Sequence, residues 1–398
     1  MRRCANITSS AEPPASLTRS ATIFRRPPLP AAPSLAAAIA GHFAPAAKII
    51  AVQEYGAGNV NDTFLVRCAP GSAQPLFILQ RLNSAVFPEP ERIMHNLRLL
   101  DAHVRSKLAS GDFGPWRMPA IVPTLSGADF QRDATGGFWR ALTFLAETEC
   151  FAAIPDLTLT REAGRALGTF HALVHDLPAH LLHDTLPGFH VTPCCLEQYD
   201  RVAVSAVRQD DSEQADFCRS FIEERREECK ILEDARQRGE LRVMVIHGDP
   251  KPGNILFAKK SGKAISIIDL DTCKPGLLHY DIGDCLRSCC NPAGEEARSL
   301  EVKFELARCR ALLQGYLPRV ASFFSAHDYR LIFAAARLIA FELGLRFFTD
   351  HLAGDCYFKT RHPGHNLRRA ANQFSLCRSI EKQKNEIKEI VAEYARHA

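Results

Sequence analysis

The stretch "VIHGDPKPGN", residues 245–254, places a carboxylate, Asp249, and a carboxamide, Asn254, five residues apart. Apolar residues precede this stretch, and the apolar run "ILF" follows it. Two prolines restrict the backbone between Asp249 and Asn254. A loop as rigid as this indicates that both side chains are held toward a common target.

The residues after Asn254 predict a β-hairpin. The run "ILF" is followed by a polar turn, "AKKSGKA", and then by "ISIIDLD", which ends in Asp269 and Asp271. A hairpin brings its two ends together, so we expect Asp249, Asn254 and Asp269 to converge on one small volume.

Three such residues predict a magnesium site used in phosphoryl transfer. A small set of oxygen ligands suits Mg²⁺, which keeps several waters and shares other positions with substrate phosphates. In kinase-like folds the first Asp accepts the proton of the acceptor hydroxyl, and the Asn and second Asp hold the metal. The alternative is a hairpin whose Asn and Asp side chains only cap turns. The ordered set of three favours catalysis.

Composition excludes several classes of protein. The chain has 398 residues, 46% hydrophobic and 24% charged, which is ordinary for a globular protein of two domains or two lobes. No window approaches the length of an uncharged membrane span. The net charge of +4 lies in residues 1–44, which hold five arginines and one glutamate. The residues after 44 carry no net charge, so they lack the excess of basic side chains that binds nucleic acid.

Residues 1–44 are rich in Ala, Pro, Ser and Arg and lack the pattern of a packed element. We expect a disordered tail there, or a start codon placed too far upstream. An organelle transit peptide is the alternative, since those are rich in Arg and Ser and poor in acids. The fourteen cysteines include no C-x-x-C pair, so we expect reduced, buried thiols in a cytoplasmic protein.

The pattern along the chain predicts a small β-rich lobe followed by a larger helical one. Strand-like runs occupy residues 48–82, an amphipathic helix is expected near 89–109, and "GGFWRALTFL" at 136–145 reads as a buried strand. A helix beginning near Thr160 as N-cap comes next, then one long charged helix near 211–238, and further helices fill 296–398.

Several segments resemble a known family. "HGDPKPGN" and "IIDLD" resemble the catalytic loop of the aminoglycoside phosphotransferase superfamily, and four longer pieces resemble its N-acetylhexosamine 1-kinases, which are anomeric sugar kinases. These pieces are "GAGNVNDTFLV", "FILQRLNSAVFPEPERIMHN", "IIDLDTCKPGLLHYDIGDCLR" and "FELGLRFFTDHLAGDCYFKTRHPGHNLRRAANQFSL", and they span residues 56–376.

The resemblance implies an α+β, bilobal protein-kinase-like fold that uses ATP and Mg²⁺ to phosphorylate a small-molecule hydroxyl. It implies a tail at 1–44, a nucleotide-binding lobe at 45–145, and a catalytic and substrate-binding lobe at 146–398. The acceptor expected from the closer subgroup is the anomeric hydroxyl of an N-acetylhexosamine, and neither a membrane nor a nucleic acid is expected as partner. The sequence leaves the oligomeric state open.

The resemblance also assigns roles to residues. Asp249 would be the catalytic base, and Asn254 and Asp269 the magnesium ligands. Asp271, Arg346 and Tyr357 would bind the sugar; a carboxylate, a guanidinium and a phenol can fix several hydroxyls by hydrogen bonds. If strand alternation continues through "DLD", Asp271 faces the same side as Asp269.

The nucleotide side is expected to use two segments. The glycine segment "GAGNVND", with Gly56, Gly58 and Asn59, would cover the phosphates as a hairpin turn; an ordinary turn without that role is the alternative. In "FILQ", Gln80 stands where kinase-like folds usually place a lysine that neutralises phosphates. Arg81 follows it but must face the opposite side of the strand.

Gln80 is one departure from the pattern of kinase-like folds, and "HGDPKPGN" is a second departure, from the pattern of the hexosamine kinases. Those kinases tend to a Cys-Asp-Thr form at this point. This departure leaves the acceptor more open than the reaction: an amino alcohol or an aminoglycoside are alternatives. A pseudokinase that binds nucleotide without catalysis is the alternative from another class. In the same region we expect Asp281 to brace the catalytic loop through backbone hydrogen bonds, and His247 to be a buried support.

Overall fold

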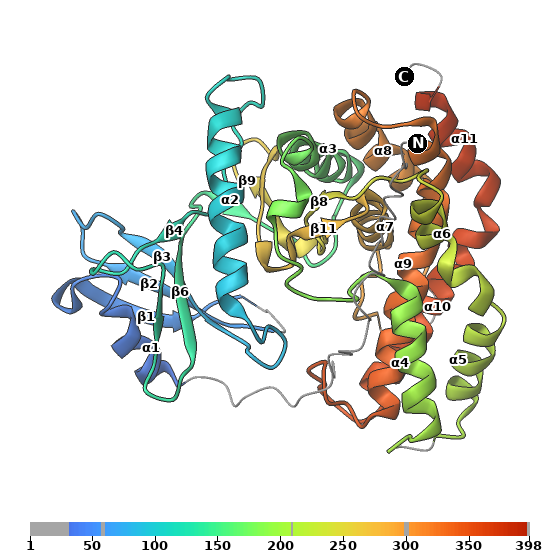
Figure 1. Cartoon of the computed structure of the whole chain (residues 1–398), viewed down its shortest axis with the longest axis horizontal. Helices are drawn as coiled ribbons and strands as arrows, with labels where there is room; N and C mark the ends of the chain where they lie inside the picture. Colours follow the sequence, from blue (N-terminus) through green and yellow to red (C-terminus); the bar gives the residue numbers. More distant parts are fainter. Residues whose placement is uncertain (1–31, 57–59, 208–209, 298–301, 396–398) are drawn as a thin grey trace, which may run out of the picture.

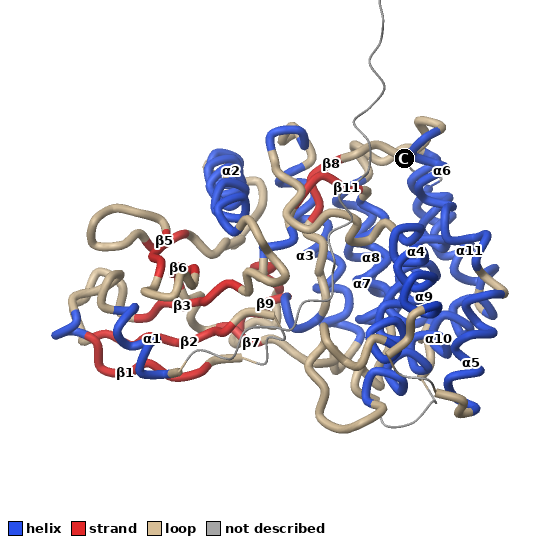
Figure 2. Tube along the Cα trace, turned by 60° about the horizontal axis from the view of Figure 1, so that its bottom comes forward, coloured by secondary structure: helices blue, strands red, loops and turns tan. Residues whose placement is uncertain are grey.

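The computed structural model describes residues 32–56, 60–207, 210–297 and 302–395, which form two lobes of different composition (Figure 1). The smaller lobe is built on a β-sheet, and the larger lobe is mostly helical, as the colouring of Figure 2 shows. The two-lobed α+β architecture predicted from the sequence is confirmed.

The small lobe is a six-stranded antiparallel sheet with two helices. The strands follow the order β1-β2-β3-β6-β4, and β5 also pairs with β6. The elements are α1 (Pro33–Ala40), β1 (Ile49–Glu54), β2 (Asp62–Cys68), β3 (Leu76–Leu82), α2 (Pro90–Leu108), β4 (Ile121–Val122), β5 (Phe130–Arg132) and β6 (Phe138–Thr143). Helix α2 also contacts α3 and the turn Leu270–Thr272 of the large lobe.

The expected tail extends too far along the chain, because α1 is part of the small lobe. Ala36, Ile39 and Ala40 are buried in one cluster with Phe43 and with side chains of the sheet. Their spacing of three and four residues is that of one helix face. Four of the eight residues of α1 are alanines, which are small and occur on both buried and exposed helix faces. The pattern of large apolar residues therefore did not predict this helix.

The large lobe contains three short strand pairings and the remaining helices. Strand β7 pairs with β9 of the hairpin β9–β10, and β8 pairs with β11. The elements are β7 (Thr148–Glu149), α3 (Leu157–Val174), α4 (Thr192–Val204), α5 (Glu213–Glu223), α6 (Ile231–Gln237), β8 (Met244–Ile246), β9 (Ile255–Ala258), β10 (Ala264–Ile267), β11 (Lys274–Gly276), α7 (Leu278–Cys289), α8 (Leu306–Val320), α9 (Ala326–Leu352), α10 (His365–Lys382) and α11 (Lys384–Ala395).

Two helix predictions need correction. Helix α3 begins before Thr160, because Asp156 is its N-cap and accepts a hydrogen bond from the Leu159 amide at 2.8 Å. The single helix expected near 211–238 is broken into α5, a 3-10 segment at Arg226–Lys230, and α6. The two halves pack on different helices, α5 on α10 and α6 on α9.

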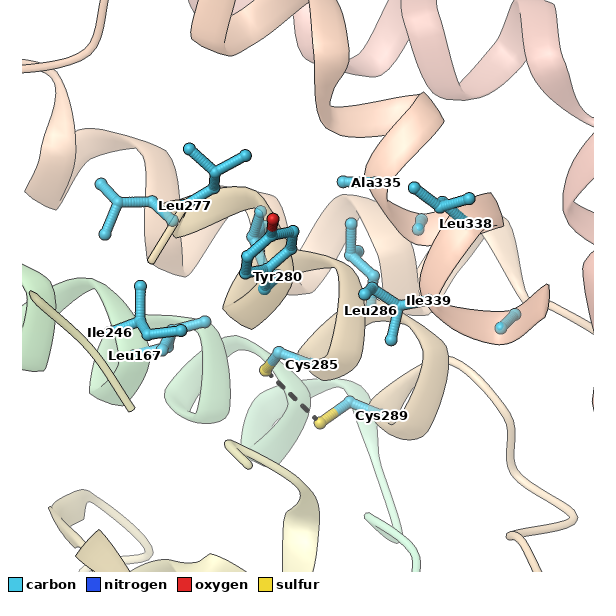
Figure 3. Packing of buried hydrophobic residues seen from close by; sticks show 14 of the residues in the cluster. Leu167, Ile246, Leu277, Tyr280, Cys285, Leu286, Cys289, Ala335, Leu338 and Ile339 are labelled. Atoms are coloured by element: carbon cyan, nitrogen blue, oxygen red, sulfur yellow. Dashed lines mark hydrogen bonds between the residues drawn. The ribbon is translucent and has the colours of Figure 1, made fainter. Parts of the chain in front are cut away.

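The core of the large lobe is built around α9 and the closely packed pair α3 and α8. Helix α9 contacts α4, α7, α10 and α11. A Cβ on Gly164 of α3 would lie 2.0 Å from the Leu312 carbonyl oxygen of α8, so the helices approach at a distance that only glycine allows. Figure 3 shows α7 in this core, with Cys285 and Cys289 packed as small apolar groups and their sulfurs 3.8 Å apart.

None of the helices in the described residues combines the length and apolar character needed to cross a membrane.

Candidate active site

Asp281 fixes the backbone of the loop that follows β8. Its two carboxylate oxygens accept hydrogen bonds from the amides of His247 and Gly248, both at 2.7 Å, as the sequence predicted. Burial raises the pKa of Asp281, but the hydrogen bond and charge of His171 and the hydrogen bond from the His247 amide lower it overall. Gly248 has φ +86°, and a Cβ there would meet the Thr272 carbonyl oxygen at 2.7 Å. The loop therefore requires glycine at this position.

His247 supports the loop from within, also as predicted. Its side chain is fully buried, and its ring nitrogens lie 3.0 Å from the Ile268 carbonyl oxygen and 3.2 Å from the Asp249 amide. Burial lowers the pKa of His247. A neutral imidazole with both nitrogens occupied is a structural support rather than an acid or base.

Asp249 lies at the end of this loop with two side chains that donate to it. The Lys251 ammonium group is 2.6 Å from Asp249 Oδ2, and Asn254 Nδ2 donates to the same oxygen at 2.9 Å. Partial burial lowers the pKa of Lys251, but the carboxylates of Asp249 and Asp269 outweigh it and raise that pKa. Because Nδ2 of Asn254 is committed to Asp249, its oxygen Oδ1 is the atom available to a cation.

The hairpin predicted from "ILF" and "ISII" is present and brings Asp269 beside Asn254. Ile255 pairs with Ile267 in the register of β9 and β10, and the Ile268 amide donates to the Asn254 carbonyl oxygen at 2.8 Å. Asp269 follows with left-handed backbone angles, φ 68° and ψ 57°. The short turn after β10 thus holds Asp269 next to the loop of Asp249.

The electrostatics of this group match the chemistry of a divalent cation. Burial raises the pKa of Asp269 to about 7, and the neighbouring charges of Asp271 and Asp249 add to this effect. The charges of Lys251 and Arg140 lower the pKa of Asp269 but do not offset burial and the two neighbouring carboxylates, so an added cation would stabilise the ionised form. Two carboxylates and an amide oxygen are the hard ligands that Mg²⁺ prefers, so Asp249, Asn254 and Asp269 fit the metal.

Asp271 does not continue the strand alternation that the sequence suggested. Strand β10 ends at Ile267, and Leu270–Thr272 form a 3-10 turn, because the left-handed Asp269 reverses the backbone. Asp271 is buried, and Asn61 Nδ2 donates to one of its oxygens at 2.8 Å while Arg140 donates to the other. Its carboxylate joins the large lobe to the small one.

Gln80 is held by Arg140, which stands opposite it across β3 and β6. Gln80 Oε1 accepts from Arg140 Nε at 3.1 Å and Nη2 at 2.8 Å, and its amide nitrogen donates to Thr63 at 3.2 Å. Arg81 points to the other side of the strand, with its Nε 4.0 Å from Asp133, as strand alternation requires. The cationic group at this point of the site is therefore Arg140.

Part of the glycine segment is described. Gly56 follows β1 with φ +78°, a conformation that favours glycine. Gly58 and Asn59 lie outside the described residues. Asn61, at the far side of this segment, reaches Asp271, so the segment ends at the site.

Arg346 and Tyr357 meet in an aromatic group of the large lobe. The guanidinium carbon of Arg346 lies 4.8 Å from the ring centre of Phe189, 5.5 Å from that of Phe358 and 5.8 Å from that of Tyr357. Asp350 holds the turn that carries two of these rings, because it accepts hydrogen bonds from the amides of Tyr357 at 2.8 Å and Phe358 at 2.9 Å. The two residues expected to bind sugar are thus neighbours.

Glu342 and His190 form a buried pair one helical turn from Arg346. His190 Nδ1 lies 3.1 Å from Glu342 Oε1, and Thr192 donates to the other oxygen of Glu342 at 2.9 Å. Burial lowers the pKa of His190 and raises that of Glu342, but their mutual attraction reverses both shifts. The second nitrogen of His190 lies 2.8 Å from the Gly248 carbonyl oxygen, so this pair also supports the loop of Asp249.

A cavity between the lobes is lined by five of the eight predicted site residues that the structure describes. Asp249, Asp269, Asp271, Arg346 and Tyr357 all line it, together with Val60, Asn61, Asn83 and Phe87 of the small lobe. Asn254 and Gln80 are outside the lining but are bonded to Asp249 and, through Arg140, to Asp271.

Sequence reasoning missed Arg140, His190, Glu342 and Asp350. Arg140 and Glu342 shared one signal: each is a single charged residue inside an apolar run, "FWRALTF" or "IAFELGL". Such a residue must be paired when its neighbours are buried. His190 and Asp350 had no comparable signal.

The sequence comparison agrees with this geometry. A family model described as "Phosphotransferase enzyme family" matches residues 51–316. The match includes the loop of Asp249, the hairpin β9–β10 and the sheet of the small lobe from residue 51 onward.

Solved structures with this fold share little sequence with the chain. An aminoglycoside phosphotransferase from Alicyclobacillus acidocaldarius is 14% identical with a TM-score of 0.56, and covers 91% of this chain and 98% of its own. A choline kinase from Cryptosporidium parvum is 14% identical with a TM-score of 0.54, covering 90% and 97%. A GDP complex of an aminoglycoside phosphotransferase is 14% identical with a TM-score of 0.50, covering 91% and 98%.

Proposed function

The chain belongs to the phosphotransferase enzyme family, and on that premise we propose that it is an ATP- and Mg²⁺-dependent sugar kinase. Its acceptor would be the anomeric hydroxyl of an N-acetylhexosamine, and its product a sugar 1-phosphate. Residues 45–145, with α1 added, would bind the nucleotide, and residues 146–398 would carry catalysis and the acceptor.

Asp249 would accept the proton of the acceptor hydroxyl as its oxygen attacks the γ-phosphorus of ATP and ADP leaves. Asn254 and Asp269 would hold Mg²⁺, which supplies positive charge to the β- and γ-phosphates when bound. Gly56, Gly58 and Asn59 would cover the phosphates. Gln80 would act on this side by orienting Arg140, whose Nη1 is buried and has no partner among the described residues.

The position of Arg346 is the observation that favours a sugar over an amine as the acceptor. Choline or an amine would be recognised by an open set of aromatic rings, but here a guanidinium already lies against Phe189, Tyr357 and Phe358. Among the described residues no carboxylate lies within salt-bridge distance of Arg346, although the charges of Glu342 and Asp249 raise its pKa, so its N–H groups can donate to an acceptor. The N–H groups of a fixed guanidinium can donate to hydroxyl and N-acetyl oxygens. Its positive charge repels a cationic acceptor.

The charge of the cavity supports a neutral acceptor. Its described lining contains six carboxylates, four Lys or Arg side chains and one histidine: Asp249, Asp269, Asp271, Asp284, Glu295 and Glu342 against Lys251, Arg287, Arg346, Arg369 and His190. His190 pairs with Glu342. The excess of two carboxylates over the Lys and Arg side chains is the charge that one divalent cation would balance. A polycationic aminoglycoside would instead require excess negative charge.

An ATP-consumption screen tests this proposal with free monosaccharides, N-acetylated sugars, choline and aminoglycosides. We expect turnover of an N-acetylhexosamine, an acid-labile product, and no turnover of its methyl glycoside, whose anomeric oxygen is blocked. We also expect Arg346→Ala to raise the KM of the sugar much more than the KM of ATP. Efficient turnover of the methyl glycoside would contradict phosphorylation at the anomeric position, and turnover of choline alone would contradict a sugar acceptor.

A further inference from the structure

We propose that Asp284 determines acceptor specificity by binding a second hydroxyl of the sugar, one that is not phosphorylated. This inference rests on the proposed sugar kinase function and adds a contact to it. It starts from the position of Asp284 on α7, almost one helical turn after Asp281. Asp281 holds the catalytic loop, and Asp284 lines the cavity beside it.

The carboxylate of Asp284 is held in place but only half used. Its Oδ1 accepts from Arg287 Nε at 2.9 Å and from Arg287 Nη2 at 2.8 Å. Its Oδ2 is buried, since the residue is only 5% exposed, and this oxygen has no hydrogen-bond partner among the described residues. A buried carboxylate oxygen left without a donor destabilises the protein, so such an atom indicates a missing partner.

Within the part of the chain that the structure describes, neighbouring groups do not supply that partner. His190 is close enough for Asp284 to raise its pKa, but its two ring nitrogens are occupied by Glu342 and by the Gly248 carbonyl oxygen. Arg287 places both of its contacts on Oδ1, and its Nη1 lies 3.6 Å from Glu295. Because Asp284 lines the cavity, a molecule bound there is the donor that we infer.

The surroundings favour a hydroxyl as that donor. An ionised carboxylate oxygen only accepts hydrogen bonds, so it selects a group with an O–H or N–H. Arg287 already pairs with the Asp284 carboxylate, so a neutral hydroxyl can join it without placing a second positive charge beside that arginine. Because Arg287 fixes the carboxylate before the acceptor arrives, little entropy is lost when a hydroxyl binds, and an acceptor without that hydroxyl leaves Oδ2 unpaired.

The test compares Asp284→Asn with the wild-type protein, using N-acetylglucosamine and its 3-, 4- and 6-deoxy analogues as acceptors. The asparagine keeps the shape and one oxygen for Arg287 but replaces Oδ2 by a donor. We expect kcat/KM for N-acetylglucosamine to fall about tenfold, the cost of a lost hydrogen bond to a charged group, with the KM of ATP unchanged. One deoxy analogue should lose about tenfold with the wild-type protein and nearly nothing further with the variant.

Glu295→Gln is the matched control, because it removes the other carboxylate near Arg287 and leaves Asp284 intact. It should show the same ranking of deoxy analogues as the wild-type protein. If Asp284→Asn lowers activity equally for every analogue, or raises the KM of ATP as well, Asp284 only supports the fold and the inference fails while the kinase function stands. If the wild-type protein phosphorylates no N-acetylhexosamine, both proposals fail.

Discussion

At the scale of single residues, the site depends on buried charges whose partners are fixed by the backbone. Asp281 shows this most directly: its carboxylate accepts from two successive loop amides, and His171 lies 2.9 Å from it. These contacts set the direction in which Asp249 leaves the loop. Asp249 itself is more accessible, with a side chain 25% exposed, as a residue must be if it contacts a substrate.

Replacing Asp249 by asparagine tests its role as the base. We expect Asp249→Asn to lower kcat by roughly 10²–10⁴-fold, the usual loss of a general base, with little change in ATP affinity or melting temperature. Steady-state kinetics and thermal unfolding measure these effects. Asp184→Asn is the control, since Asp184 pairs with Lys274 away from the cavity lining. A kcat within threefold of wild type would rule out Asp249 as the base.

At the scale of elements, the hairpin β9–β10 and helix α1 are positioned in different ways. The hairpin places Asn254 and Asp269 together through its own register, over fifteen residues of chain. Helix α1 has no such local constraint and is held by apolar contacts with the sheet of the small lobe. The first arrangement follows from local sequence, and the second depends on packing.

Truncation measures the contribution of α1. A chain that lacks residues 1–44 loses the buried side chains of Ile39 and Phe43, so we expect its free energy of unfolding to fall by roughly 3–6 kcal/mol, at 1.5–3 kcal/mol for each. A chain that lacks only residues 1–31 keeps the helix and serves as the reference. Urea unfolding compares the two, and equal midpoints would show that α1 contributes no stability.

At the scale of the whole molecule, Asp271 is the point where the two lobes are joined by charge. It lies in the turn after Asp269, and it accepts from Asn61 just before β2 and from Arg140 on β6. Arg140 and Asp271 are 1% and 2% exposed, so their interaction is hardly screened by water. The expected metal ligand and the nucleotide side of the cavity are thereby held in one arrangement.

Removing one charge of this pair should destabilise the protein strongly. We expect Arg140→Met to lower the free energy of unfolding by about 3–5 kcal/mol, because it leaves the Asp271 carboxylate buried without its cation. The double variant Arg140→Met with Asp271→Asn should recover part of that loss, since the uncompensated charge is gone. Urea unfolding of the three proteins gives the values. A loss below about 1 kcal/mol in the single variant would mean that water reaches the pair.

The sequence by itself determined the centre of the candidate site. Asp249, Asn254 and Asp269 lie within 21 residues, and a proline-stiffened loop followed by a hairpin leaves them few ways to be arranged. Gln80 and Arg81 could likewise be assigned to opposite faces, because strand alternation is a local property. The two-lobed outline followed from strand and helix periodicities.

Only the tertiary structure decided the contacts between distant segments. Asn61 and Asp271 are 210 residues apart and Arg140 and Asp271 are 131 apart, and the side-chain types alone do not say which acid meets which base. The break at Arg226–Lys230, the docking of α1 and the unpartnered oxygen of Asp284 likewise depend on which faces pack together. Local sequence sets backbone geometry within an element, whereas pairing across the core is selected by the packing of the whole chain.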